Sequence, residues 1–276
     1  MSYFHLNLIL KGKLTVCCLL MLPAIPLNAQ REAKQIGDFK ESISLNEHLR
    51  GTKRTLQYRP DGDEFVCVNG KNRYTRALYG SHSPFRVETS DRPVFAFYNN
   101  GRGGNISFKV ILRDGTELAL DRTGHCESRY SAGKRTYYLT DPSWGKGELR
   151  ISVLALADMD GAIWRFSPSN MPKGAILRWQ HGGATGKRLS RNGDMGVDPA
   201  DCFELPAEAT DLVTGELPLQ KEVYLVRGEV PEGYNVRKLY QQAEAASLAL
   251  ASHLKIETPD PYLNTLGGCL LYTSPS

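Results

Sequence analysis

Apolar and polar residues alternate in short runs through the middle of the chain, from about Arg54 to Val230. Runs of this kind, rich in β-branched and aromatic residues and bounded by turn residues, are typical of half-buried β-strands. They recur at intervals of roughly 10–20 residues, and no helix-period segment lies between them. This spacing predicts a mainly β fold, a large antiparallel β-sandwich, rather than alternating strands and helices.

Three Asx-Gly pairs lie between strand-forming runs and predict hairpin turns, because a positive φ angle costs Asn, Asp and Gly little. The three pairs are Asn69-Gly70, Asp114-Gly115 and Asp160-Gly161. Four further strands are expected, at Val94–Tyr98, Arg135–Leu139, Ala175–Gln180 and Glu222–Arg227. The predicted sandwich domain covers residues 30–232.

The pattern becomes helical after the sequence VPEG at residues 230–233. In NVRKLYQQAEAASLALASHL, apolar residues recur near a spacing of 3.6, and Ala, Gln and Leu are frequent. Asn235 is a suitable N-cap. Pro259 and Pro261 then require an extended loop. One linker helix is therefore expected within residues 233–257, and the start of a further helical domain at residues 258–268.

The first 29 residues have the features of an export signal. Lys11 and Lys13 precede a nine-residue apolar run, Leu14–Leu22, which is too short to span a bilayer. Ala29 is a plausible last residue before cleavage. We therefore expect a protein exported to the periplasm or the cell surface. The alternative is a buried N-terminal helix.

Composition narrows the possible partners. Hydrophobic residues make up 41% and charged residues 23%, as in a globular protein with a core. The formal net charge is only +4, and the Lys and Arg residues are scattered, so no nucleic-acid partner is expected. No other apolar run approaches the length of a membrane span.

The remaining cysteines and one motif-like run predict no metal or cofactor site. Cys67, Cys126, Cys202 and Cys269 form no CxxC pair, so we expect small buried or free thiols rather than a zinc ribbon. The run HGGATGK at residues 181–187 lacks the first Gly and the final Ser or Thr of a phosphate-binding loop. A loop without a ligand is expected there.

Functional side chains are most dense in GHCESRY, residues 124–130. Because no strand period is evident there, the run is interpreted as a loop on which His125, Glu127 and Arg129 contact a polar substrate. The alternative is a structural loop held by salt bridges. Trp144, in the polar sequence DPSWGKG, is a candidate for stacking on a sugar ring if it is exposed. The alternative is that its ring closes an end of the sandwich.

Three runs resemble one family of exported proteins from polysaccharide-degrading gut bacteria, domain-of-unknown-function family 4450. They are residues 58–80, residues 124–166 and TPDPYLNTLGG at residues 258–268. The resemblance extends over about residues 35–268. It implies a glycoside hydrolase-like protein in which an N-terminal β-supersandwich leads through a linker helix into a six-hairpin (α/α) toroid. In such proteins the toroid supplies the catalytic carboxylates.

The sequence departs from this family after Gly268. The family continues there into an Ala-rich helix, whereas residues 269–276, CLLYTSPS, are interpreted as foreign sequence. The resemblance then implies that the catalytic residues lie beyond residue 268 and that the partners are an oligosaccharide or polysaccharide and a C-terminal helical domain. The chain is predicted to be the N-terminal, non-catalytic part of a secreted glycoside hydrolase-like protein. The alternative is a self-contained carbohydrate-binding or structural β-sandwich.

Overall fold

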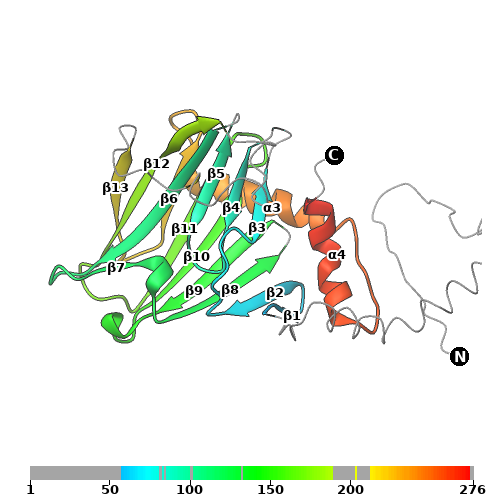
Figure 1. The fold of residues 1–276 in the computed structure, drawn as a ribbon, viewed down its shortest axis with the longest axis horizontal. Coiled ribbons are helices and arrows are strands. Elements are labelled where there is room, and N and C mark those ends of the chain that lie inside the picture. Colours follow the sequence, from blue (N-terminus) through cyan, green and yellow to red (C-terminus); the bar gives the residue numbers. More distant parts are fainter. Residues whose placement is uncertain are drawn as a thin grey trace, which may run out of the picture. The chain divides into compact units, whose positions relative to one another are not determined.

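The computed structural model describes residues 57–80, 83, 85–99, 102–131, 133–188, 203 and 212–273. These residues form two antiparallel sheets and two α-helices (Figure 1). The predicted antiparallel β-sandwich is therefore confirmed. The predicted export signal and Cys202 lie outside the described residues. None of the described helices has the length and apolar character needed to cross a membrane.

The first sheet has seven strands in the order β1-β2-β8-β9-β10-β11-β14. Their bounds are Arg59–Asp61 (β1), Glu64–Val68 (β2), His125–Ser131 (β8), Lys134–Thr140 (β9), Glu148–Ala155 (β10), Gly161–Ser169 (β11) and Val223–Gly228 (β14). A short 3-10 helix, Pro142–Trp144, connects β9 to β10.

The second sheet has the order β13-β12-β6-β5-β4-β3, and β7 pairs with the end of β6. The bounds are Arg76–Tyr79 (β3), Arg86–Thr89 (β4), Phe95–Asn99 (β5), Arg102–Ile111 (β6), Glu117–Ala119 (β7), Ile176–Arg188 (β12) and Val213–Pro218 (β13). A second 3-10 helix, Leu120–Arg122, follows β7.

Two of the three predicted hairpins are present. Asp114-Gly115 joins β6 to β7, and Gly115 has the positive φ angle that the turn requires, 86°. Asp160-Gly161 ends the turn between β10 and β11, in which the Leu156 N–H group donates to the Gly161 carbonyl oxygen at 2.8 Å. Each turn joins two strands that pair with each other, β6 with β7 and β10 with β11. The residues of the turn themselves therefore set its geometry.

The hairpin predicted at Asn69-Gly70 is wrong. β2 pairs with β1 and β8, and the chain passes after Gly70 to the second sheet. Asn69 does have a positive φ angle, 51°, but its N–H group donates to the Cys126 carbonyl oxygen at 2.8 Å. A Cβ atom on Gly70 would lie 2.4 Å from the Asp91 carboxylate. The Asn-Gly pair is therefore not a two-residue turn. It lies where the chain passes from the first sheet to the second, and Gly70 lets the backbone pass close to the Asp91 side chain.

The loop expected at residues 181–187 is also wrong, because β12 continues through this run to Arg188. It pairs with β6 as far as Gly183 opposite Gly104, and a bulge separates this pair from the next. His181 is therefore a strand residue, whose Nδ1 atom accepts a hydrogen bond from the Arg227 Nε atom at 2.9 Å.

Trp164 of β11 joins the two sheets in the core. Its ring is fully buried, and its centroid lies 5.6 Å from Phe95, 5.7 Å from Phe97 and 6.0 Å from Phe108, all on the second sheet. Tilted and edge-on aromatic pairs of this kind add to the free energy of burial. The large indole thus fills the space between the sheets where β11 faces β5 and β6.

The helix expected in residues 233–257 is confirmed as α3, Val236–Ala251, and the Asn235 side chain caps it by accepting a hydrogen bond from the Lys238 N–H group at 3.1 Å. Leu239, Tyr240 and Ala243 pack on the outer side of the first sheet. There they meet the β10 and β11 side chains that point away from the main core, and the helix covers this part of the sheet (Figure 1).

A further helix, α4, spans Pro261–Thr273. Asp260 caps its first turn, because its Oδ1 atom accepts from the Tyr262 N–H group at 2.8 Å. The Thr265 hydroxyl donates to the Gly62 carbonyl oxygen at 2.9 Å, and the Tyr262 ring lies 6.5 Å from Phe65. The segment TPDPYLN thus forms a capped helix start that packs beside β1 and β2. The foreign origin of residues 269–276 stays a prediction.

A charged pair is buried between the two sheets. Arg135 of β9 and Asp91, in the turn between β4 and β5, are both fully buried, and their Nη2 and Oδ1 atoms lie 3.6 Å apart. Arg135 also donates to the Ser90 carbonyl oxygen at 3.2 Å and to the Ser128 hydroxyl at 3.0 Å. The Tyr137 hydroxyl donates to the same Ser90 oxygen at 2.8 Å. The first sheet is therefore tied to the β4–β5 turn of the second.

Replacing Asp91 with Ala would leave the Arg135 guanidinium buried without its counter-charge. We expect the free energy of unfolding to fall by about 3–5 kcal/mol, the cost typical of breaking a buried pair on one side. Urea denaturation followed by tryptophan fluorescence measures this change.

Asp158→Ala is the matched control, because Asp158 is exposed in the β10–β11 turn. It should change the free energy of unfolding by no more than about 0.5 kcal/mol. Equal effects of the two substitutions would contradict a stabilising role for the buried pair.

Candidate functional site

The run predicted as a loop, GHCESRY, forms the strand β8 instead. It pairs with β2 on one side and β9 on the other. The even-numbered residues from Cys126 to Tyr130 are buried, whereas His125, Glu127 and Arg129 lie on the outer side of the first sheet. Strand alternation thus brings the three predicted substrate-binding residues onto one face. Their contact with a substrate stays a prediction.

Arg129 is engaged by three carboxylates on that face. Its Nε atom lies 2.6 Å from Glu127, and its Nη1 atom lies 2.9 Å from Asp61 and 3.1 Å from Glu64. The ion pairs with Asp61 and Glu64 join β8 to the β1–β2 hairpin. The arrangement matches the structural salt-bridged alternative, although the element is a strand rather than a loop.

Trp144 does not lie on this face, because its ring is packed into the core and is only 2% exposed. An exposed position for sugar stacking is therefore wrong, and the ring fills the interior near the β9–β10 connection. An aromatic side chain that is exposed on this face is Tyr138 of β9, which lies opposite Glu127 and is 38% exposed. The guanidinium carbons of Arg129 and Arg150 lie 5.8 Å and 5.3 Å from its ring centre.

Sequence reasoning missed Tyr138 for an identifiable reason. The run KRTYYLT contains two adjacent tyrosines, of which one must face the core and the other the solvent. The sequence does not show which tyrosine faces the solvent, because Arg135 makes the wrong side of the strand look exposed. A charged residue normally indicates the solvent face of a strand. Here Arg135 and Tyr137 point into the interior, so Tyr138 lies outside.

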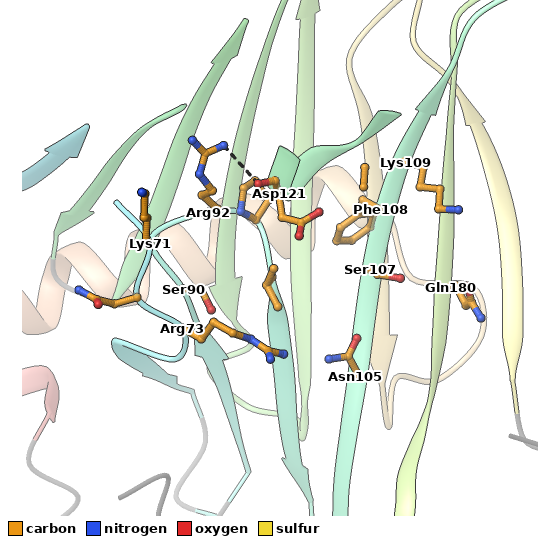
Figure 2. A pocket seen from close by; sticks show the side chains of 14 residues that line it. Lys71, Arg73, Ser90, Arg92, Asn105, Ser107, Phe108, Lys109, Asp121 and Gln180 are labelled. Atoms are coloured by element: carbon orange, nitrogen blue, oxygen red, sulfur yellow. Dashed lines mark hydrogen bonds between the residues drawn. The ribbon is translucent and has the colours of Figure 1, made fainter. Parts of the chain in front are cut away.

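A pocket of about 570 Å³ lies on the outer side of the second sheet (Figure 2). Its floor is formed by Asn105, Ser107 and Lys109 of β6 and by Gln180 of the neighbouring strand β12. These β6 residues alternate with side chains that belong to the main core, so they point away from it. The floor is therefore polar and is carried by two central, paired strands.

Two other segments form the walls of this pocket. Lys71, Asn72 and Arg73 come from the connection between β2 and β3, and Ser90, Arg92, Pro93 and Val94 come from the β4–β5 turn. Ala119 of β7, Asp121 of the following 3-10 helix and Phe108 of β6 complete the described lining. In Figure 2, Arg73 extends across the pocket toward Asn105, and Arg92 lies beside Asp121.

The buried Asp91 holds the two walls together. Its Oδ2 atom accepts from the Asn72 N–H group at 2.9 Å, and its own N–H group donates to the Asn72 carbonyl oxygen at 2.9 Å. Its Oδ1 atom accepts from the Thr75 hydroxyl at 3.2 Å and from Tyr58. Burial raises the pKa of the Asp91 carboxyl, and the Asn72 N–H group and Arg135 oppose this shift. The pocket walls thus share one buried anchor.

Arg92 has a fixed orientation in its wall. Its Nη1 atom donates to the carbonyl oxygens of Asp121 at 3.2 Å and Thr123 at 2.8 Å, and its Nη2 atom donates to the Asn69 side chain at 3.3 Å. All three acceptors are uncharged oxygens. The guanidinium is therefore held in place without being neutralised by these contacts.

The family of the chain is indicated by one match. Residues 100–229 match the family model described as Domain of unknown function (DUF4450). These residues belong to the DUF4450 family. The DUF4450 match includes β8 and all four residues of the pocket floor, whereas the two cationic walls at residues 71–73 and 92 precede it. None of the curated proteins matches the chain.

The described residues contain no group of three or more His, Cys, Asp or Glu side chains that could hold a metal ion. Cys67 and Cys126 are both buried and free, which confirms for these two the expected buried or free thiols. They lie near the buried Arg135, on β2 and β8. Burial raises the pKa of the Cys126 thiol to about 12.

Cys126 should therefore resist alkylation in the folded protein. At pH 8 its thiol is protonated and shielded, and the thiolate is the reactive form. We expect iodoacetamide to leave Cys126 unmodified under native conditions and to modify it fully in guanidinium chloride, as measured by peptide mass mapping. The denatured sample is the control for intrinsic reactivity. Complete native labelling of Cys126 within minutes would contradict the prediction.

Proposed function

We propose that this β-sandwich is the saccharide-binding, non-catalytic part of a glycoside hydrolase-like protein that acts on polysaccharides. The resemblance carried by residues 58–80, 124–166 and 258–268 supports the hydrolase parentage. In this proposal the protein is exported by the signal at residues 1–29 to the periplasm or cell surface. A C-terminal helical domain supplies the catalytic carboxylates.

The observation that carries the binding role is the polar floor of the pocket on the second sheet. Asn105, Ser107 and Gln180 present amide and hydroxyl groups, which both donate and accept hydrogen bonds and so match sugar hydroxyls. Asn105 is only 7% exposed, so its side chain is held within the floor rather than extended into solvent. A volume of about 570 Å³ lies in the range usual for small-ligand pockets.

The chemistry of the lining favours binding over hydrolysis at this pocket. Glycoside hydrolysis generally uses two carboxyl groups on either side of the scissile bond. Among the described lining residues, Asp121 is the one carboxylate. The proposal therefore assigns recognition of a saccharide to the sandwich and bond cleavage to the C-terminal domain.

Binding to a glycan array, followed by calorimetry with the best-bound oligosaccharide, tests this proposal. Asn105→Ala and Gln180→Ala should each weaken binding about tenfold, because each removes hydrogen bonds to the ligand. Thermal unfolding of each variant checks that the fold is kept. Released sugars are assayed in the same samples, and none are expected from this chain.

Tyr138→Ala is the matched control, because it removes an exposed ring from the outer side of the other sheet. It should leave the affinity unchanged. If Tyr138→Ala abolished binding while Asn105→Ala did not, the saccharide site would lie on the first sheet. The absence of any bound glycan would overturn the proposed function, and hydrolysis by the chain would overturn its non-catalytic part.

A further inference from the structure

We infer that the pocket on the second sheet takes an acidic saccharide, whose carboxylate or sulfate group lies against Arg92 and Lys71. This inference rests on the proposed function, because it names the chemical class of the saccharide. The charge of the lining points to the acidic group of the ligand, and the polar floor points to its hydroxyl groups.

Positive charge is concentrated at this pocket. Four of the described lining side chains are cationic, Lys71, Arg73, Arg92 and Lys109, against the single carboxylate of Asp121. The whole chain of 276 residues has a formal net charge of only +4. The local excess is therefore not a reflection of a generally basic protein. Cations gathered in a concave site attract an anionic ligand and raise its local concentration.

The hydrogen bonds of Arg92 leave its guanidinium charged and oriented, so it can bind an anion. Its three hydrogen bonds go to uncharged oxygens of Asp121, Thr123 and Asn69, which orient the guanidinium. These bonds use at most three of its five N–H donors, so at least two remain for a ligand. A planar guanidinium with free donors suits the bidentate recognition of a carboxylate or a sulfate.

Two lysines extend this cationic lining. Lys71 is exposed on the other wall, at the start of the segment that Asp91 anchors through Asn72. Lys109 lies at the end of the floor and pairs with Glu117 at 3.4 Å, but both side chains are at least 40% exposed. An ion pair as exposed as this is weak, so an anionic ligand can compete with Glu117 for Lys109.

The polar floor explains why the ligand is a saccharide rather than a small anion. A single carboxylate or sulfate ion would fill only a small part of about 570 Å³. Asn105, Ser107 and Gln180 offer hydrogen bonds to several hydroxyl groups along β6 and β12. A uronic acid or a sulfated sugar would meet both parts of the pocket, with its hydroxyls on the floor and its acidic group at Arg92.

The test uses an array printed with uronic-acid oligosaccharides, sulfated oligosaccharides and neutral counterparts of the same backbones. We expect binding to the acidic members at least about tenfold tighter than to their neutral counterparts. The affinity should fall as NaCl is raised from 50 to 500 mM, because salt screens exposed charges. The carboxylated and sulfated arms show which acidic group is preferred.

Lys71→Gln should weaken binding of the preferred acidic oligosaccharide several-fold and leave its neutral counterpart unaffected. Because Lys71 is exposed, this variant should fold normally. Arg92→Gln should weaken it further, with thermal unfolding as a check on the β4–β5 turn. Lys146→Gln removes the same charge from an exposed lysine outside the described lining and should change nothing.

The outcomes separate the two proposals. Equal affinity for acidic and neutral oligosaccharides, or unchanged affinity in both Lys71→Gln and Arg92→Gln, would overturn the acidic-ligand inference and leave saccharide binding standing. No binding to any member of the array would overturn both.

Discussion

The buried pair of Arg135 and Asp91 links the interior of the sandwich to the pocket on its surface. Removing two charges from water is costly, and the cost is offset only if each charge is well partnered. The Nη2 atom of Arg135 reaches Ser90, Ser128 and Asp91, and its guanidinium lies 5.7 Å from the ring centre of Tyr137, whereas its Nε and Nη1 atoms have no hydrogen-bond partner among the described residues. Because these partners come from both sheets, the pair fixes how the β4–β5 turn sits against the first sheet.

The same aspartate determines where the cationic walls of the pocket lie. Asp91 exchanges hydrogen bonds with Asn72, whose neighbours are Lys71 and Arg73, and Arg92 follows Asp91 directly in the chain. The floor needs no such anchor, because it belongs to the paired strands β6 and β12. The pocket thus combines a sheet surface with walls that the Asp91 carboxylate joins, together with the hydrogen bond from the Tyr74 N–H group to the Ser90 hydroxyl.

The outer sides of the two sheets differ in a way that bears on function. On the first sheet, α3 covers β10 and β11, and the ion pairs of Arg129 occupy much of the polar surface near β8. On the second sheet, Phe203 packs over Ala96 and Tyr98 of β5, whereas the part formed by β6 and β12 carries the polar pocket. Helix α3 thus covers part of the first face, whereas the second face has the polar pocket beside its own ion pairs of Arg178 with Glu117 and Glu216.

The sequence by itself determined the features that depend on neighbouring residues. The β-sandwich class, the hairpins at Asp114-Gly115 and Asp160-Gly161 and the capped helix after Asn235 follow from alternation, turn geometry and capping, which act over a few residues. Only the tertiary structure decided the conformation of Asn69-Gly70 and GHCESRY and the burial of Trp144, because these depend on contacts with strands that are distant in the chain. The candidate pocket belongs to this second group. Its walls and floor come from segments separated by up to about a hundred residues, and the buried Asp91–Arg135 pair that positions them violates the polar-outside pattern on which sequence reasoning relies.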